Sequence, residues 1–349
     1  MTEIKSSNIF GSAGKKAELI GMIHIPINNI LLGISNGDAL PSMNVKDHKI
    51  WFAINNEFQK QSENISVPEF KSEFPGVLAI SSHIGTINKL VKKLSFINYL
   101  EDRAAKEIEL MHKHGFSFFQ LENIGAPYST RNEIPIIEQC VMEYITSFIK
   151  SLFPDIRLGI QVLSFADNVA LEIAARHNLE YVRGESFMFS GLRPDTSNKI
   201  SGTLKKAYLL RSFFNRELEK GNNNKPCIFV DIQKKHTFFT ESLDDIEIWL
   251  DNIRFMKIEG IILSGKNTGS PIDIEDFIRT RDFVDKLKVN DDPIDIPIIA
   301  GSGASLKNIN EYKKYCDAII VGSYIKKSGN WEDTVDEQAL KHFIDIYIS

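Results

Sequence analysis

The 349-residue sequence has few cysteines, the residues that form disulfides in many small secreted proteins and bind structural zinc. It has only three cysteines, Cys140, Cys227 and Cys316, and these lie far apart without CxxC or CxxH spacing. The pattern argues against a disulfide framework and against a zinc ribbon. Because Cys227 and Cys316 lie at or inside apolar runs, we expect buried, reduced thiols.

Long hydrophobic runs and a basic excess are also missing. No run approaches the roughly 18 apolar residues of a membrane-spanning helix, and residues 1–9 lack the apolar core of a signal peptide. The formal net charge is −5 and the pI is about 6.0, so nucleic acid is not an expected partner. Hydrophobic residues make up 43% and charged residues 25%. We therefore expect a soluble, cytoplasmic protein without a membrane span.

Eight short β-branched runs recur along the chain, and most are followed by a helical pattern. Most are continuously apolar, as expected of strands that are buried on both faces of a parallel sheet. The runs cover residues 18–24, 116–122, 156–162, 180–185, 226–231, 259–264, 296–301 and 316–322. Helical patterns cover residues 100–114, 169–177, 204–220, 243–257, 274–287, 306–315 and 336–346. This alternation predicts a single (β/α)8 TIM barrel over residues 1–349, with a doubly wound open sheet as the alternative.

The segment 30–96 interrupts this rhythm, because about 90 residues separate the first two strands where one helix and short loops normally suffice. It follows the first strand, so it should emerge at the C-terminal end of the barrel, where active sites lie. We predict an insertion or lid. A peripheral loop or an oligomer contact is the alternative, and a homo-oligomer is left open.

Small-residue turns follow the last two strands. Gly301-Ser302-Gly303 ends the seventh strand and Gly322-Ser323 ends the eighth, and in a barrel these loops are neighbours. Glycine lets the backbone approach a ligand closely, and amides at a helix start favour an anion. The turns therefore predict a phosphate site, with tight turns that bind nothing as the alternative.

A third loop of this kind follows the sixth strand and adds Ser264, Gly265 and Thr268 to the predicted substrate-binding residues. Lys266 in the same loop either adds charge to the anion site or is a solvated lysine.

The fifth strand ends at Asp231, and Lys235 and His236 follow it closely. A carboxylate at the end of an apolar strand needs a partner or a function, because an unpaired buried charge is costly. Histidine carries protons near neutral pH, and lysine can serve as an electrostatic clamp or a nucleophile. We predict that all three are catalytic. The alternative is a surface ion pair beside a capping aspartate.

Polar side chains also end the first four strands. They are His24 on the first strand, Glu122 and Asn123 on the second, Gln161 on the third, and Arg183 and Glu185 on the fourth. We assign catalytic roles to His24, Glu122 and Glu185, and substrate binding to the other three. A core histidine, a structural salt bridge and a divalent-metal site are the alternatives. The cofactor is unknown, with a divalent metal and flavin mononucleotide both left open.

Several of these motifs together resemble the BtpA/SgcQ family. The resemblance covers roughly residues 18–28 and 98–345. It rests on Gly21-Met22-Ile23-His24-Ile25-Pro26, Glu122-Asn123 with Ala126-Pro127, Asp231 with Lys235-His236, Ser264-Gly265 with Thr268-Gly269, Gly301-Ser302-Gly303, and Val321-Gly322-Ser323 with Lys326-Lys327 and Gly329.

The family is similar to phosphate-binding TIM barrels, and its chemistry is poorly defined. Its founding member is associated with photosystem I biogenesis, and a relative with a sugar-utilisation cluster. This chain departs from the family pattern at residues 161–166, at Gly184-Glu185-Ser186 and in the long segment after Pro26, all of them around the expected substrate site.

Taken together, these patterns predict an enzyme that acts on a small phosphorylated metabolite, either a sugar phosphate or a nucleotide. The chemistry would be acid–base isomerase, lyase or hydrolase chemistry. The alternative is a non-catalytic assembly or regulatory factor on a barrel scaffold, since fold alone does not settle function.

Overall fold

The structure is a computed structural model. It describes residues 9–10, 17–32, 43–62, 77–124, 134–163, 166–185, 191–192, 199–200, 226–232, 238–239, 248–250, 253, 258–265, 270–286, 288–289, 292–293 and 296–349.

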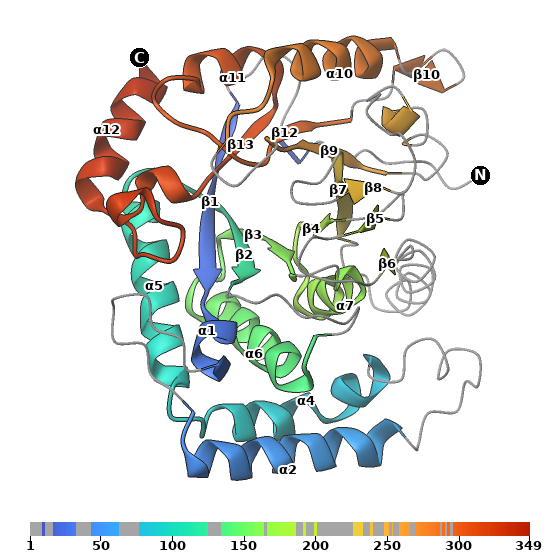
Figure 1. Ribbon diagram of the computed structural model, residues 1–349, viewed down its shortest axis with the longest axis vertical. Coiled ribbons are helices and arrows are strands. Elements are labelled where there is room, and N and C mark those ends of the chain that lie inside the picture. The colour runs from blue at the N-terminus through green and yellow to red at the C-terminus, as the bar shows by residue number, and fades with distance from the viewer. Residues whose placement is uncertain are drawn as a thin grey trace.

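Eight parallel strands close into a barrel in the order β1-β13-β12-β9-β7-β4-β3-β2. They are β1 (Glu18–Ile25), β2 (Phe118–Asn123), β3 (Arg157–Gln161), β4 (Tyr181–Gly184), β7 (Cys227–Ile232), β9 (Gly260–Leu263), β12 (Ile298–Ala300) and β13 (Ala318–Val321). Each corresponds to one of the eight apolar runs, so the predicted (β/α)8 TIM barrel is confirmed. Figure 1 shows helices packed outside these strands.

The helices are α1 (Ile27–Leu32), α2 (Val45–Ser62), α4 (Val77–Val91), α5 (Ile97–Lys113), α6 (Ile136–Leu152), α7 (Asp167–His177), α10 (Ile274–Lys286), α11 (Ile309–Tyr315) and α12 (Glu337–Ile348). Two 3-10 turns, η1 (Ser323–Ile325) and η2 (Lys327–Gly329), follow β13. α5 ends where the sequence predicts, because Gly115 has a φ of +93° that disfavours other residues. The predicted helix 204–220 and most of 243–257 lie outside the described residues.

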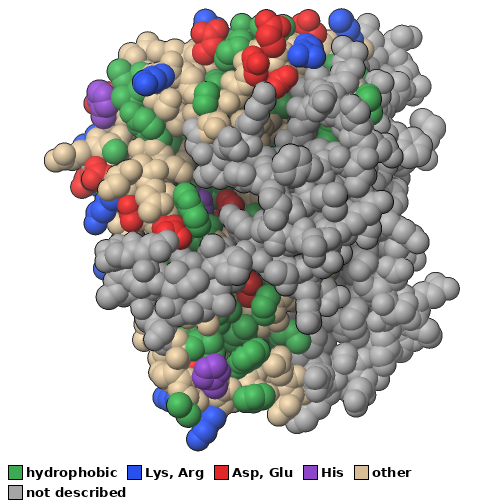
Figure 2. Space-filling model, viewed as in Figure 1, with side chains coloured by type: hydrophobic (Ala, Val, Ile, Leu, Met, Phe, Trp, Pro, Cys, Tyr) green, Lys and Arg blue, Asp and Glu red, His purple; other side chains and the backbone are tan. Residues whose placement is uncertain are grey.

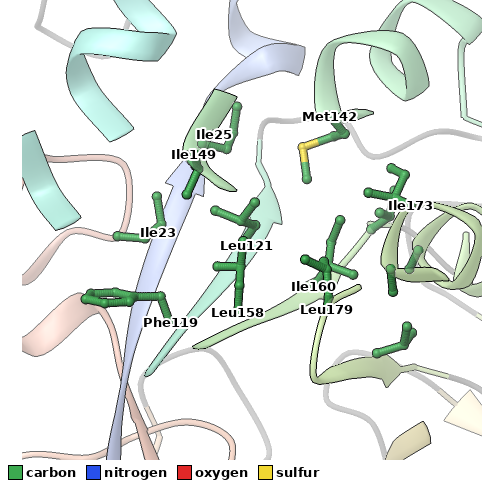
Figure 3. Close-up of a cluster of buried hydrophobic side chains, with 14 of the residues drawn as sticks. Ile23, Ile25, Phe119, Leu121, Met142, Ile149, Leu158, Ile160, Ile173 and Leu179 are labelled. Atoms are coloured by element: carbon green, nitrogen blue, oxygen red, sulfur yellow. The ribbon is translucent and has the colours of Figure 1, made fainter. Parts of the chain in front are cut away.

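Apolar side chains on each strand point alternately outwards and inwards. The outward set packs against the helices, and Figure 3 shows Ile25 of β1 and Leu121 of β2 beside Ile149 and Met142 of α6. This layer is nearly inaccessible to water, so it supplies the main hydrophobic stabilisation of the fold.

The inward set fills the N-terminal half of the barrel with aromatic rings. Tyr181 and Phe229 stack at a centroid distance of 4.7 Å, and Phe118 meets Tyr181 edge-on at 5.5 Å. Phe10 stacks on Phe118 at 5.6 Å and closes this end of the barrel. A Cβ at Gly159 would lie 2.3 Å from the Tyr181 ring, so glycine on β3 provides the space that the ring occupies. This half of the barrel is therefore packed with side chains.

The long segment between β1 and β2 contains the helices α2 and α4, which pack against each other and against α6. In Figure 1 they lie beyond the arrowheads of β1 and β2, on the C-terminal side of the barrel. Short strands add a sheet of β5 (Gly191–Leu192), β6 (Lys199–Ile200) and β8 (Phe238–Phe239), and a pair of β10 (Lys288–Val289) and β11 (Asp292–Pro293).

None of the helices in the described ranges is both long and apolar enough to span a bilayer. Acidic and basic side chains are intermixed along the edge formed by α10 and α11 in Figure 2. The three cysteines are buried and none of them is in a disulfide, and burial raises the pKa of the Cys140 and Cys316 thiols. Cys227 and Cys316 are core residues, as the sequence predicts.

Candidate functional site

A ring of polar and glycine residues occupies the C-terminal end of the barrel, which we call the mouth. Below it, the inward side chains are mostly apolar, for example Ile20, Phe229 and Ile262. The ring consists of the last inward-facing residue on each strand, in barrel order His24, Glu122, Gln161, Glu185, Asp231, Ser264, Gly301 and Gly322. The sequence predicts each of these positions singly as a catalytic or binding residue, and the closed barrel brings all eight to one mouth.

Asp231 is held by Arg183 from the neighbouring strand β4. The guanidinium binds the carboxylate in a bidentate manner, with Nε 2.9 Å from Oδ2 and Nη2 2.8 Å from Oδ1. Arg183 also donates to the Gly301 carbonyl at 3.2 Å and to Ser264 Oγ at 3.1 Å, and Ser264 Oγ donates to Asp231 Oδ1. Arg183 and Asp231 are 2% and 1% exposed, so this is a buried, hydrogen-bonded ion pair and not a surface pair.

Burial disfavours the charged form of Arg183, but the carboxylate of Asp231 outweighs burial and raises the pKa of the guanidinium. The cation in turn favours the ionised form of Asp231. Through this ion pair and the bond to the Gly301 carbonyl, Arg183 links β4 to β7 and to the glycine turn after β12.

Glu185 stands at the end of a chain of hydrogen bonds that starts deep in the barrel. Tyr181 OH donates to Gln120 Oε1 at 2.6 Å, Gln120 Nε2 donates to Gln161 Oε1 at 3.1 Å, and Gln161 Nε2 donates to Glu185 Oε1 at 3.0 Å. Every donor in the chain points towards the mouth, so the last acceptor is the carboxylate. Gln161 therefore orients Glu185. Gln120 was missed by the sequence reasoning, although its position two residues before Glu122 places it on the inward face.

His24 and Glu122 occupy adjacent strands at the same level of the mouth. The register pairs them directly, and His24 Nε2 lies 3.9 Å from Glu122 Oε2. His24 is 7% exposed, whereas the Glu122 side chain is 15% exposed. This arrangement gives a proton carrier beside a more accessible carboxylate, which is the pairing that acid–base chemistry requires.

The glycine turns after β9 and β12 press against each other. Gly265 N donates to Ser302 Oγ at 3.1 Å, and a Cβ at either Gly265 or Gly303 would lie 2.2 Å from the Ser270 carbonyl oxygen. Gly303 also has a φ of +72°. Close backbone approach therefore accounts for these two glycines, and Ser302 is tied to the turn.

Several backbone N–H groups in the turns after β12 and β13 are not used in hydrogen bonds within the described part of the chain. Gly301 N donates to Leu263 O. Among the residues that the structure describes, the next N–H groups, those of Ser302, Gly303 and Ala304, donate to no acceptor, and neither do those of Gly322 and Ser323. A Cβ at Gly322 would meet Met22 and His24 only at ordinary contact distances of 3.4 and 3.6 Å. The two turns thus offer unused donors beside an uncrowded inward position.

The structure assigns Asn123 and Lys326 to places away from the mouth. Asn123 was predicted to bind substrate, but it lies one residue beyond Glu122 and points outwards, where Nδ2 donates to Leu163 O and Oδ1 accepts from Leu163 N. Its role is to hold the loop after β3, not to line the ring. Lys326 follows β13 closely but is not available to an anion, because it is buried with Nζ 2.8 Å from Glu107 Oε2.

Lys235, His236 and Thr268 lie outside the described residues, so their predicted roles stay predictions. Within the described ranges, no three His, Cys, Asp or Glu side chains are grouped so that they could hold a metal ion.

Relatives and solved structures are similar to this chain over the barrel. An uncharacterised protein of Methanocaldococcus jannaschii is 29% identical over 246 residues, 70% of this chain and 85% of the relative. A photosystem I biogenesis protein, BtpA of Synechocystis, is 27% identical over 245 residues, 70% and 78% of the two chains.

Among solved structures, a ligand complex of KGPDC from Streptococcus mutans has a TM-score of 0.43 and 14% identity, covering 71% of this chain and 92% of that one. Phosphoribosyl anthranilate isomerase from Thermus thermophilus has a TM-score of 0.38 and 12% identity, covering 70% and 93%. Likenesses this distant say nothing about the activity of this chain. The profile of the BtpA family, in contrast, matches residues 90–348, about three quarters of the sequence, and the chain belongs to the BtpA family.

Proposed function

We propose that this protein is an enzyme that acts on a small phosphorylated metabolite by acid–base chemistry of the isomerase, lyase or hydrolase kind. The observation that carries the proposal is the division of the ring at the mouth. Glycines occupy the adjacent strands β12 and β13, whereas carboxylates occupy β2, β4 and β7 on the other side.

The glycine side suits a phosphate group. The N–H groups of Ser302, Gly303, Gly322 and Ser323 supply donors from two adjacent loops, and backbone donors bind anions without a counter-charge. The buried Arg183 donates to the Gly301 carbonyl and so holds the first loop in place. Close packing would explain the glycines at 265, 301 and 303, but the open inward position at Gly322 has no such packing reason.

The opposite side suits proton transfer on the group that carries the phosphate. His24 and Glu122 form one acid–base pair, and Glu185, oriented by Gln161, supplies a second carboxylate. Asp231, paired with Arg183, would orient a substrate hydroxyl or stabilise positive charge. Lys235 and His236 follow β7 in sequence, and we assign them a charge clamp and a proton carrier.

Thermal stabilisation by phosphorylated compounds tests the phosphate site. A ligand at one hundred times its Kd stabilises the folded state by about 2.7 kcal/mol. For 349 residues the unfolding entropy is about 0.7 kcal/mol/K, so the melting temperature should rise by about 4 °C. No rise with any sugar phosphate, nucleotide or free phosphate, at concentrations well above millimolar, would contradict the proposal.

Gly322→Val is the sharpest variant for this test. Its Cβ meets its neighbours only at ordinary contact distances, and the added methyl groups enter the mouth between the two loops. The melting temperature without ligand checks that the variant keeps its fold. We expect the stabilisation to disappear. Ala105→Val on the outer helix α5 is the control, because it places a valine at a partly exposed position outside the barrel.

A non-catalytic assembly factor is the second candidate, and one surface favours it. Val45 and Phe52, seven residues apart on α2, are 73% and 63% exposed, and Figure 2 shows hydrophobic side chains at the end of the molecule formed by α2 and α4. This would make the segment 30–96 a partner surface, whereas the enzyme proposal makes it part of a lid over the mouth. In a strain lacking the gene, Val45→Glu/Phe52→Glu should fail to complement if the chain is an assembly factor. Glu185→Gln should fail to complement if it is an enzyme.

A further inference from the structure

Trp331 stands beside the ring although it belongs to no barrel strand. Its indole lies 6.3 Å from the His24 ring, centroid to centroid, with the planes at 70°. The side chain is partly exposed, so it has surface left for another contact. Strand ends were the signal for the other site residues, and Trp331 carries no such signal because it lies ten residues after the end of β13.

The loop that carries Trp331 is closed at its base by backbone contacts. Lys326 pairs with Val335 in an isolated bridge, Lys327 N donates to Thr334 O at 3.0 Å, and Asp336 N donates to Ile325 O at 2.8 Å. The turn contains Ser328 with a φ of 55°, an uncommon conformation for a residue with a side chain. The fold therefore fixes this loop in one conformation.

Three buried charges fasten the same loop to α5. Arg103 Nη2 donates to the carbonyls of Glu332 at 2.6 Å and Asp333 at 3.1 Å, directly after Trp331. Glu107 Oε2 binds Lys326 at 2.8 Å, and Glu107 Oε1 lies 3.4 Å from Arg103 Nε. Burial lowers the pKa of Lys326, and the Glu107 carboxylate opposes this effect.

Such a cluster is an unfavourable way to stabilise a loop, because apolar side chains of similar volume often do as well or better. Its directed contacts do, however, fix where the carbonyls after Trp331 lie. The use of buried charges here is explained if the position of the indole matters.

We propose that Trp331 is a ligand-binding residue, whose indole packs against the sugar ring that carries the phosphate in the bound ligand. This inference rests on the proposed function. Trp331 adjoins His24 on β1, and Gly322, the glycine of the second turn, also borders His24. An indole at this place contacts the group next to the phosphate, not the phosphate itself.

The ligand class is therefore a phosphorylated sugar ring, either free or within a nucleotide. A sugar presents an apolar C–H face to an aromatic ring and hydroxyl donors at its edge. The carboxylates of Glu122 and Glu185 accept hydrogen bonds from hydroxyl groups. An acyclic phosphate such as glycerol 3-phosphate offers the hydroxyls without the ring.

Binding measurements on ring-bearing and ring-less phosphates test the proposal. D-ribose 5-phosphate and AMP are compared with glycerol 3-phosphate and inorganic phosphate by titration calorimetry. In the wild type, the ring-bearing ligands should bind about tenfold more tightly than glycerol 3-phosphate. Trp331→Ala should remove this preference and leave the affinity for glycerol 3-phosphate unchanged. Phe10→Ala, which removes an aromatic ring at the closed N-terminal end of the barrel, is the control and should keep the preference.

The outcomes separate the two proposals. If Trp331→Ala keeps the ring preference, or the wild type has none, the inference is overturned while the phosphate site stands. If no phosphorylated compound binds the wild type, the proposed function fails and the inference fails with it. Equal losses for both ring-bearing ligands support contact with the sugar, and a loss for AMP alone overturns the sugar assignment in favour of the base.

Arg103 is the positioning residue in this scheme. Arg103→Met leaves the Glu107–Lys326 pair balanced in charge but removes Nη2, the atom that donates to both carbonyls after Trp331. We expect the ratio of ring-bearing to ring-less affinities to fall. A purely structural role would lower the melting temperature and leave that ratio intact, which would overturn the assignment.

Discussion

Replacing Asp231 by Asn should destabilise the protein although the two side chains have nearly the same shape. Arg183 cannot lose its proton, so the variant leaves a buried cation opposite a neutral amide. Both side chains of the pair are almost inaccessible to water, at 2% and 0% exposure. Water therefore cannot replace the lost carboxylate.

The magnitude follows from the remaining contacts of Arg183. Removing one partner of a buried ion pair costs about 3–5 kcal/mol. Arg183 keeps the Gly301 carbonyl at 3.2 Å and Ser264 Oγ at 3.1 Å, which favours the lower end, about 3 kcal/mol. With an unfolding entropy of about 0.7 kcal/mol/K for 349 residues, the melting temperature should fall by about 4 °C.

Asp317→Asn is the matched control for a calorimetric melting experiment. Asp317 also pairs with an arginine, through a single contact of 2.8 Å between Oδ2 and Nη2 of Arg281, and accepts from Ile298 N, but these side chains are 24% and 22% exposed. The control should cost less than about 1 kcal/mol. If the two variants melt at the same temperature, burial does not set the strength of the Arg183–Asp231 pair, and the reasoning is refuted.

Three further predictions concern packing and pH. Gly301→Ala places a Cβ 2.4 Å from Ile262 Cγ2 and should cost about 1–3 kcal/mol in urea unfolding; an unchanged free energy of unfolding would contradict the close packing. Phe10→Ala removes the stacking at the N-terminal end and should lower stability by about 1–2 kcal/mol while phosphate affinity stays the same; weaker ligand binding would count against a purely structural ring. Burial raises the pKa of Glu172 to about 7 from 4.5, so the folded state retains a proton that the unfolded state releases. Wild-type stability should therefore fall relative to Glu172→Gln as the pH rises from about 4.5 to 7, and parallel melting-temperature curves between these pH values would disprove it.

The barrel could be predicted because its strands carry their signal locally. Each strand is buried on both faces, so it appears as a continuous apolar run. The eight runs match the eight strands of the closed barrel. Helix α6 was not predicted, and within the segment 30–96 the helices α2 and α4 were not separated from the loops around them. The sequence did carry a signal for α6, because its buried residues Ile137, Val141, Ile145 and Ile149 recur at helical spacing.

The residues of the candidate site that lie at the C-terminal ends of strands could be predicted from the sequence. Strand alternation would also have separated Glu122, which points into the barrel, from Asn123, which holds the loop after β3. The partner of Asp231 could not be inferred from the sequence, because Arg183 is adjacent only once β4 and β7 pair in the sheet. Trp331 depends on the folding of its loop against α5, which no local pattern records.

The packed N-terminal half of the barrel has a kinetic consequence. With Phe10, Phe118, Tyr181 and Phe229 filling that end, exchange with solvent through the barrel axis is blocked there. In an enzyme of the proposed kind, substrate and product would have to pass through the same opening, one after the other. A product that keeps its phosphate would occupy the loops that the next substrate needs, so inhibition by that product would be competitive with substrate.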